Sequence, residues 1–114
     1  MTMDSTSLNQ LASEQLVAAR DAHSGRAGHT IHGGHEHGLR QTVLALTSGR
    51  ELAEHNSPGE ATLQVLHGRV RLSTHSDAWE GGEGDFVVIP PERHALAALE
   101  DSVVLLTVVV RQPD

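Results

Sequence analysis

A chain of 114 residues has room for one domain with one modest hydrophobic core. Its 15 acidic residues outnumber 8 basic ones, all of them Arg, and the resulting net charge of −7 disfavours binding to nucleic acid or to an anionic membrane. Cysteine is absent, which excludes disulfides, thiolate metal sites and a Cys nucleophile. The polar N-terminus does not resemble a signal peptide and no apolar run is long enough to span a membrane, so we expect a cytoplasmic protein.

Residues 5–22 are predicted to form a helix, because Leu and Ala recur at helical spacing and Ser5 or Ser7 can cap its start. Its apolar stripe is narrow, so we expect it to lie against another element. The following segment, 23–38, holds five Gly, five His and few large apolar residues, which predicts a loop or an arm. We therefore divide the chain into an N-terminal helix and arm, 1–38, and a β domain, 39–114.

From residue 39 onward the pattern is that of short strands separated by turns. Many strands at intervals of about 8 to 12 residues favour an all-β fold, a closed or two-sheet antiparallel barrel. Pro90-Pro91 should end one strand, because neither residue has a backbone donor for a ladder. The predicted strands are 39–47, 51–55, 61–67, 69–74, a short strand at Trp79, 86–89 and 103–110.

The last predicted strand, 103–110, is apolar on both faces. Such a strand should be covered on both sides, by the barrel interior on one and by the N-terminal helix or a second subunit on the other. We therefore expect a homodimer.

Two glycine-framed motifs lie within the β domain. In the first, Gly49 is followed after five residues by His55, and the frame ends at Gly68. This spacing resembles the first motif of the cupin superfamily, although Ser57 stands at its second His position and Ala61 at its Glu position.

The second motif begins with Gly84 and, after five residues, Pro90, as in cupins. His94 lies one position before the expected His, at Ala95, and Glu92 replaces the usual Gly. The resemblance covers residues 39–110 and implies a cupin-type double-stranded β-helix, a jelly-roll barrel, preceded here by the helix and arm.

The resemblance also implies a pocket in the barrel with a divalent metal, Fe, Mn, Zn, Ni or Cu, on three His and one Glu. His55 and His94 are the matching ligands. Glu60 replaces the missing Glu if the register shifts by one residue, and Gln64 faces the pocket if a bulge redirects it. Either Arg40 or Gln41, at the start of the first long strand, could point into the pocket and hold an anionic group.

The pair His35 and His37, on either side of Glu36, lies before this frame. One interpretation is a solvated or dimer-contacting arm, and the other is an arm that contributes to a metal or ligand site. His67, beside a predicted hairpin turn, is expected to be exposed.

Two classes of function follow. The first is a cupin that binds a metal ion or small molecule without catalysis. The second is a metal-dependent enzyme, similar to a dioxygenase or an isomerase, that acts on a small organic substrate. A regulatory module that serves a DNA-binding domain is disfavoured, because this sequence shows no such domain.

Overall fold

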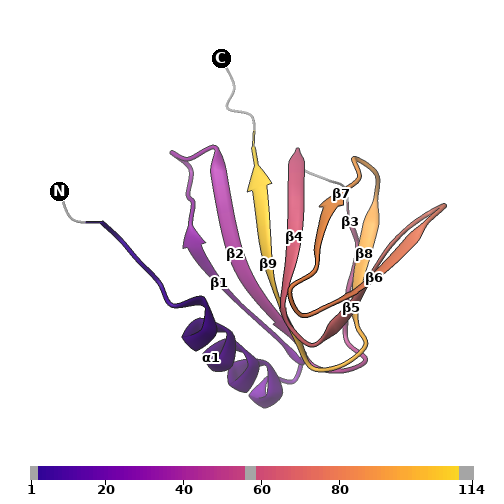
Figure 1. Cartoon of the computed structure of the whole chain (residues 1–114), viewed down its shortest axis with the longest axis horizontal. Coiled ribbons are helices and arrows are strands. Elements are labelled where there is room, and N and C mark those ends of the chain that lie inside the picture. Colours follow the sequence, from indigo (N-terminus) through magenta and orange to yellow (C-terminus); the bar gives the residue numbers. More distant parts are fainter. Residues whose placement is uncertain (1–2, 56–58, 111–114) are drawn as a thin grey trace.

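The computed structural model describes residues 3–55 and 59–110, except for the side chains of residues 54 and 55. One helix precedes nine strands in these ranges (Figure 1). The elements are α1 (Leu8–Asp21), β1 (Arg26–His32), β2 (Leu39–Leu46), β3 (Glu51–His55), β4 (Glu60–His67), β5 (Arg69–Thr74), β6 (Ala78–Gly82), β7 (Phe86–Ile89), β8 (His94–Ala98) and β9 (Ser102–Val109).

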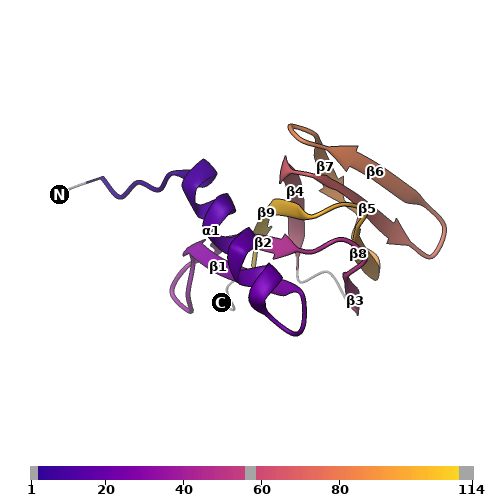
Figure 2. The ribbon, with the colours of Figure 1, turned by 90° about the horizontal axis from the view of Figure 1, so that it is seen from below.

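The strands form two antiparallel sheets that face each other (Figure 2). The larger sheet has the order β1-β2-β9-β4-β7, and the smaller has the order β3-β8-β5-β6. At one end of this barrel, three strands begin (β2, β4 and β8) and three strands finish (β3, β7 and β9). We call it the upper end, and it is at the top of Figure 1. The all-β barrel expected from the strand pattern and the jelly-roll implied by the cupin resemblance are both confirmed.

The core lies between the two sheets. Alternate residues of each strand face inward, as the period of two for β-strands requires. In β4 the inward residues are Ala61, Leu63 and Val65, which pack in one cluster with aliphatic side chains from the opposite sheet. Few aromatic groups are available, so Val and Leu fill this space.

The helix α1 covers the outer face of the larger sheet at its lower end (Figure 1). The Ser7 hydroxyl caps the helix by accepting a hydrogen bond from the Gln10 N–H at 3.2 Å. Leu11 and Leu16 then pack against a second apolar cluster on β2 and β9 that includes Val43 and Val103. The predicted helix and its contact with another element are therefore confirmed.

Two strands were not predicted. Residues 26–32, within the segment interpreted as a loop or arm, form β1 at the edge of the larger sheet. Most β1 side chains are exposed, so its sequence carries almost no apolar alternation. Residues 94–98 form β8, whose run of Ala has little of the β-branched or aromatic character that indicates a strand.

The motif glycines occupy turns that demand positive φ. Gly49, Gly68 and Gly84 have φ of +86°, +82° and +88°. Gly68, between β4 and β5, is also crowded, because a Cβ there would collide with the Asp101 carbonyl and with Ser102. The glycine spacing of the two motifs therefore marks the positions of turns between strands, and this is why the motifs predict the fold.

Candidate functional site

His94 is the first residue of β8, directly after the Pro90-Pro91 turn at the upper end. Its side chain is 4% exposed and shares the inward face of β8 with Leu96 and Ala98. The ring Nδ1 lies 2.9 Å from the Glu92 carbonyl oxygen. Because a carbonyl only accepts hydrogen bonds, Nδ1 carries the proton, and Nε2 holds the lone pair when the ring is neutral.

His55 is the residue of β3 whose backbone lies opposite His94. Leu52 pairs with Leu96, and a register shift of one residue between Leu52 and His55 aligns His55, instead of Glu54, with His94. The backbones of the two predicted metal ligands therefore adjoin. The expectation that their rings share one cavity concerns the His55 side chain, which lies outside the described residues, as does Ser57.

Arg40 and Gln41 point to opposite faces of β2. Arg40 pairs with Val108, whose side chain packs on the core between the sheets, so Arg40 faces the barrel interior. Its Nε is buried and has no hydrogen-bond partner among the described residues. Gln41 faces outward, where its Nε2 donates to Thr107 Oγ1 at 3.3 Å.

Polar groups continue inward from Arg40. Thr42 lies two residues further along the same face of β2, and its hydroxyl is 3.3 Å from that of Thr30 on β1. Arg40 thus lies on the inward face of the larger sheet, and the His94 imidazole lies on the inward face of the smaller one.

Glu60 and Gln64 are both exposed in the structure. The one-residue shift that would turn Glu60 inward is absent, since Glu60 pairs with Val109 and the inward neighbour is Ala61. Gln64 pairs with Phe86 and Leu105 on the outer face. The irregularity in β4 comes only after Val65, so it does not redirect Gln64.

This architecture is similar to that of three solved structures. A conserved protein of unknown function from Streptococcus pyogenes matches with a TM-score of 0.71 at 29% identity, over 81% of this chain and 80% of that one. An RmlC-like cupin from Desulfovibrio desulfuricans matches with a TM-score of 0.71 at 19% identity, over 95% and 97% of the two chains. The chain folds as a cupin.

The protein KdgF from a Halomonas species is also similar to this cupin domain, with a TM-score of 0.68 at 20% identity over 81% of this chain and 86% of that one. No protein-family sequence model matches the chain, and no curated protein matches it in sequence. The described part of the chain contains no helix with the length and apolar character of a membrane span.

The metal set that a cupin implies does not fit the residues present. Ala61, at the position of the Glu ligand, is 5% exposed and packed in the core, where it offers no oxygen. Within residues 3–53 and 59–110, no three His, Asp or Glu side chains gather closely enough to hold an ion. We therefore derive no step through a bound metal.

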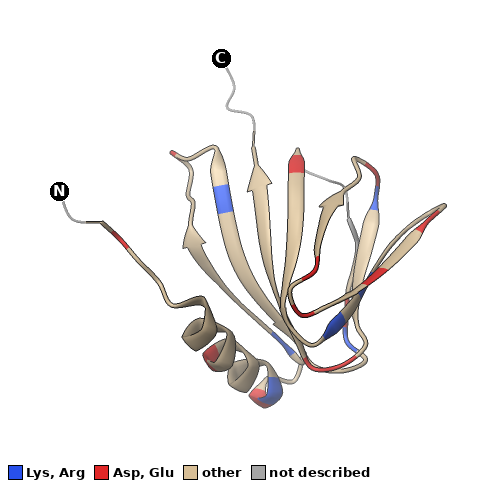
Figure 3. Cartoon of the chain, in the orientation of Figure 1, with Lys and Arg blue, Asp and Glu red and all other residues tan. Residues whose placement is uncertain are grey.

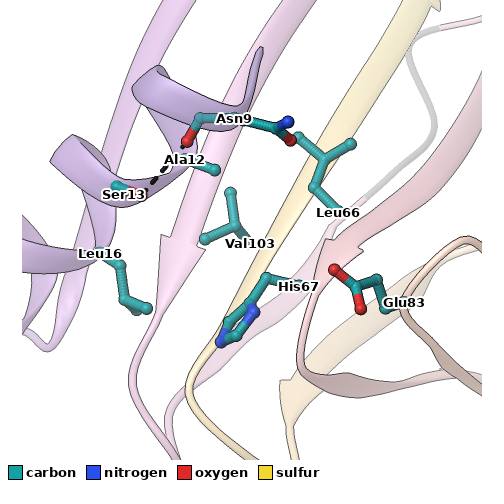
Figure 4. A pocket seen from close by; sticks show the side chains of 8 residues that line it. All are labelled: Asn9, Ala12, Ser13, Leu16, Leu66, His67, Glu83 and Val103. Atoms are coloured by element: carbon teal, nitrogen blue, oxygen red, sulfur yellow. Dashed lines mark hydrogen bonds between the residues drawn. The ribbon is translucent and has the colours of Figure 1, made fainter.

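A pocket that the sequence did not indicate lies between α1 and β4 (Figure 4). Its volume is about 210 Å³, and its lining includes the polar His67 and Glu83 and the apolar Leu16 and Val103. A register shift between Val65 and His67 pairs His67 with Val103 and so turns the ring outward, toward the helix. His67 is exposed, as predicted, but it lines a cavity that depends on this bulge.

A larger hollow of about 620 Å³ opens on the outer face of the larger sheet, near its upper end, where α1 does not reach. The side chains around it are mostly apolar or hydroxylated, and Figure 3 shows that the strands of this sheet carry few charges. Its lining includes Thr62, Val88, Pro91, Thr107 and Val109.

Proposed function

We propose that this cupin domain binds a small anionic molecule, a carboxylate, inside the upper end of the barrel. The proposal rests on the side chain of Arg40. Its Nε is buried, faces the interior and has no hydrogen-bond partner among the described residues. A buried donor without an acceptor costs about 1 to 3 kcal/mol, and more when the group is charged. A carboxylate would satisfy the guanidinium with two parallel hydrogen bonds.

His94 supplies the second contact in this proposal. Its Nδ1 is held by the Glu92 carbonyl, so a neutral ring can meet a ligand hydroxyl only as an acceptor, at Nε2. His55, opposite His94 in the β ladder, is the third residue that we assign to the pocket. A small hydroxy acid combines the carboxylate and the hydroxyl that these groups recognise, so it is the class of ligand that this proposal favours.

The test of this function is a calorimetric titration of untagged protein with mono-, di- and tricarboxylates. Arg40→Gln should lower the affinity for the best ligand about 10-fold or more, because the pair loses a charge-assisted contact of about 1.5 to 3 kcal/mol. Arg26→Gln, an exposed Arg on the adjacent strand β1, is the matched control. Equal affinities in the Arg40 variant and the wild type would reject the proposal.

A metal-dependent enzyme is the second candidate, and the hydrogen bond between His94 and the Glu92 carbonyl favours it. A His that binds a metal usually donates its other ring N–H to such a carbonyl. This candidate requires His55 and His94 as ligands. Elemental analysis decides it: stoichiometric Fe, Mn, Zn, Ni or Cu that is lost in both His55→Ala and His94→Ala would support the enzyme.

We also propose that a second copy of the chain covers the upper outer face of the larger sheet. Phe86, Val88 and Val109 are 59%, 65% and 42% exposed there, beyond the reach of α1. Aliphatic and aromatic groups grouped in this way favour association, and a homodimer removes them from water.

A further inference from the structure

Two histidines of the β1–β2 hairpin are in contact outside the barrel. The rings of His32 and His37 are in contact, with their centres 4.8 Å apart and their planes at 67°. His32 is the last residue of β1 and pairs with the outward-facing Gln41, so the ring contact is on the other side of the sheet from Arg40. From this contact we infer a second binding site, for a divalent transition-metal ion, on the hairpin.

The separation of the two rings suits a chelate. With each nitrogen about 2.0 to 2.1 Å from an ion, two imidazole rings in neighbouring coordination positions have centres roughly 4.5 to 5.2 Å apart. The observed 4.8 Å lies within this interval. In this contact the rings meet edge to face, and both side chains are exposed, so rotation about χ2 can reorient the ring nitrogens without moving buried groups.

The backbone of the hairpin preorganises the pair. Gly33 and Gly34 have φ of +145° and +139°, values that other residues rarely adopt. The chain then turns, and the His37 N–H donates to the Gly34 carbonyl at 3.1 Å. Beyond the turn, the Val110 N–H donates to the Gly38 carbonyl at 2.8 Å and ties the hairpin to the end of β9. The entropy lost on binding an ion is therefore small.

The donors decide which ions fit. Neutral imidazoles prefer Cu²⁺, Ni²⁺ and Zn²⁺, whereas Mg²⁺ and Ca²⁺ require oxygen ligands. No third His, Asp or Glu is gathered at this pair in the described structure, so water completes the coordination. His35 and Glu36, which are exposed in the same turn, keep the ion in a polar environment.

The experiment is a calorimetric titration of the untagged, metal-free protein with NiCl2 and ZnCl2, with MgCl2 as the negative probe. His32→Ala and His37→Ala should each weaken Ni²⁺ binding roughly tenfold or more, since the second imidazole binds intramolecularly. His29→Ala, exposed on the same strand, and His75→Ala, exposed on another turn, should change the affinity less than about twofold.

A nuclear magnetic resonance readout locates the ion independently of affinity. Substoichiometric Ni²⁺ should broaden the backbone signals of residues 31–38 before any others. Ni²⁺ affinity that is unchanged in the His32→Ala/His37→Ala double variant overturns the inference. So does broadening that centres on residues 93–95 and disappears in His94→Ala, which would assign the ion to the barrel. Carboxylate binding at Arg40 is a separate measurement, so either site can fail without the other.

Discussion

His55 and His94 occupy opposed positions on neighbouring antiparallel strands, aligned by one extra residue in β3. Residues paired in this way interact most strongly with each other, so their effects on ligand binding should not be additive. We expect a coupling free energy of about 0.5 to 3 kcal/mol between His55→Ala and His94→Ala, measured as a double-mutant cycle on carboxylate affinity. Additivity within about 0.5 kcal/mol would show that the two histidines act independently.

Gly68 should be the least replaceable of the motif glycines. All three have positive φ, but only at Gly68 would a Cβ collide with neighbouring backbone, whereas nothing lies within 4 Å of a Cβ at Gly49 or Gly84. Gly84→Ala and Gly49→Ala should therefore cost about 1 kcal/mol, and Gly68→Ala about 2 to 4 kcal/mol. Urea denaturation measures the difference, and equal midpoints for Gly68→Ala and Gly84→Ala would contradict it.

Asp101 should make the stability of the domain depend on pH. The Ser48 N–H donates to its carboxylate at 2.8 Å and Arg20 Nε at 3.0 Å, and these contacts lower the pKa of Asp101 below its ordinary value of 3.8. A lowered pKa stabilises the fold above the pKa of the unfolded chain, and this contribution is lost as the pH falls through the folded pKa.

The test is Asp101→Asn, which should lower the free energy of unfolding at pH 7 by about 0.5 to 1 kcal/mol, as expected for a partly exposed ion pair. The gap from the wild type should close below about pH 4. Asp4→Asn, an exposed carboxylate before the helix, serves as the control and should leave the stability unchanged. A gap that persists at pH 2 would show that the loss is one of packing.

The uncovered outer sheet predicts a concentration-dependent dimer. Val88→Asp places a charge in the middle of the exposed apolar group and should shift the protein to monomer in size exclusion with light scattering. Val17→Asp, at a position 56% exposed on α1, should leave the oligomeric state unchanged. If the wild type is already a monomer at high concentration, this surface has no partner of its own kind.

Features of the fold that depend on a local turn or on a short periodicity could be predicted from the sequence. Gly49, Gly68 and Gly84 set the frame of the barrel because each sits in a turn that needs positive φ. The choice between Arg40 and Gln41 was left open by the sequence, and the pairing of β2 with β9 resolves it in favour of Arg40 as the inward residue.

The features that could not be predicted from the sequence depend on pairing between strands that are far apart in the chain. The extra residue in β3 that aligns His55 with His94, and the bulge in β4 that turns His67 toward the helix, are set by partner strands far along the chain. Strand β1 belongs to the sheet because it pairs with β2, although its own side chains give little sign of it. The contact between His32 and His37 is likewise a product of that hairpin.

The position of α1 has a consequence for any shortened form of the protein. The helix shields Val43 and Val103, which lie on the same outer face as the exposed Val109. Removal of residues 1–22 would therefore expose a second aliphatic patch on this face, separated from the one at Val109 by the polar pair Gln41 and Thr107. Such a truncated chain should aggregate during expression, and its insolubility would say nothing about the carboxylate binding proposed for the inner face.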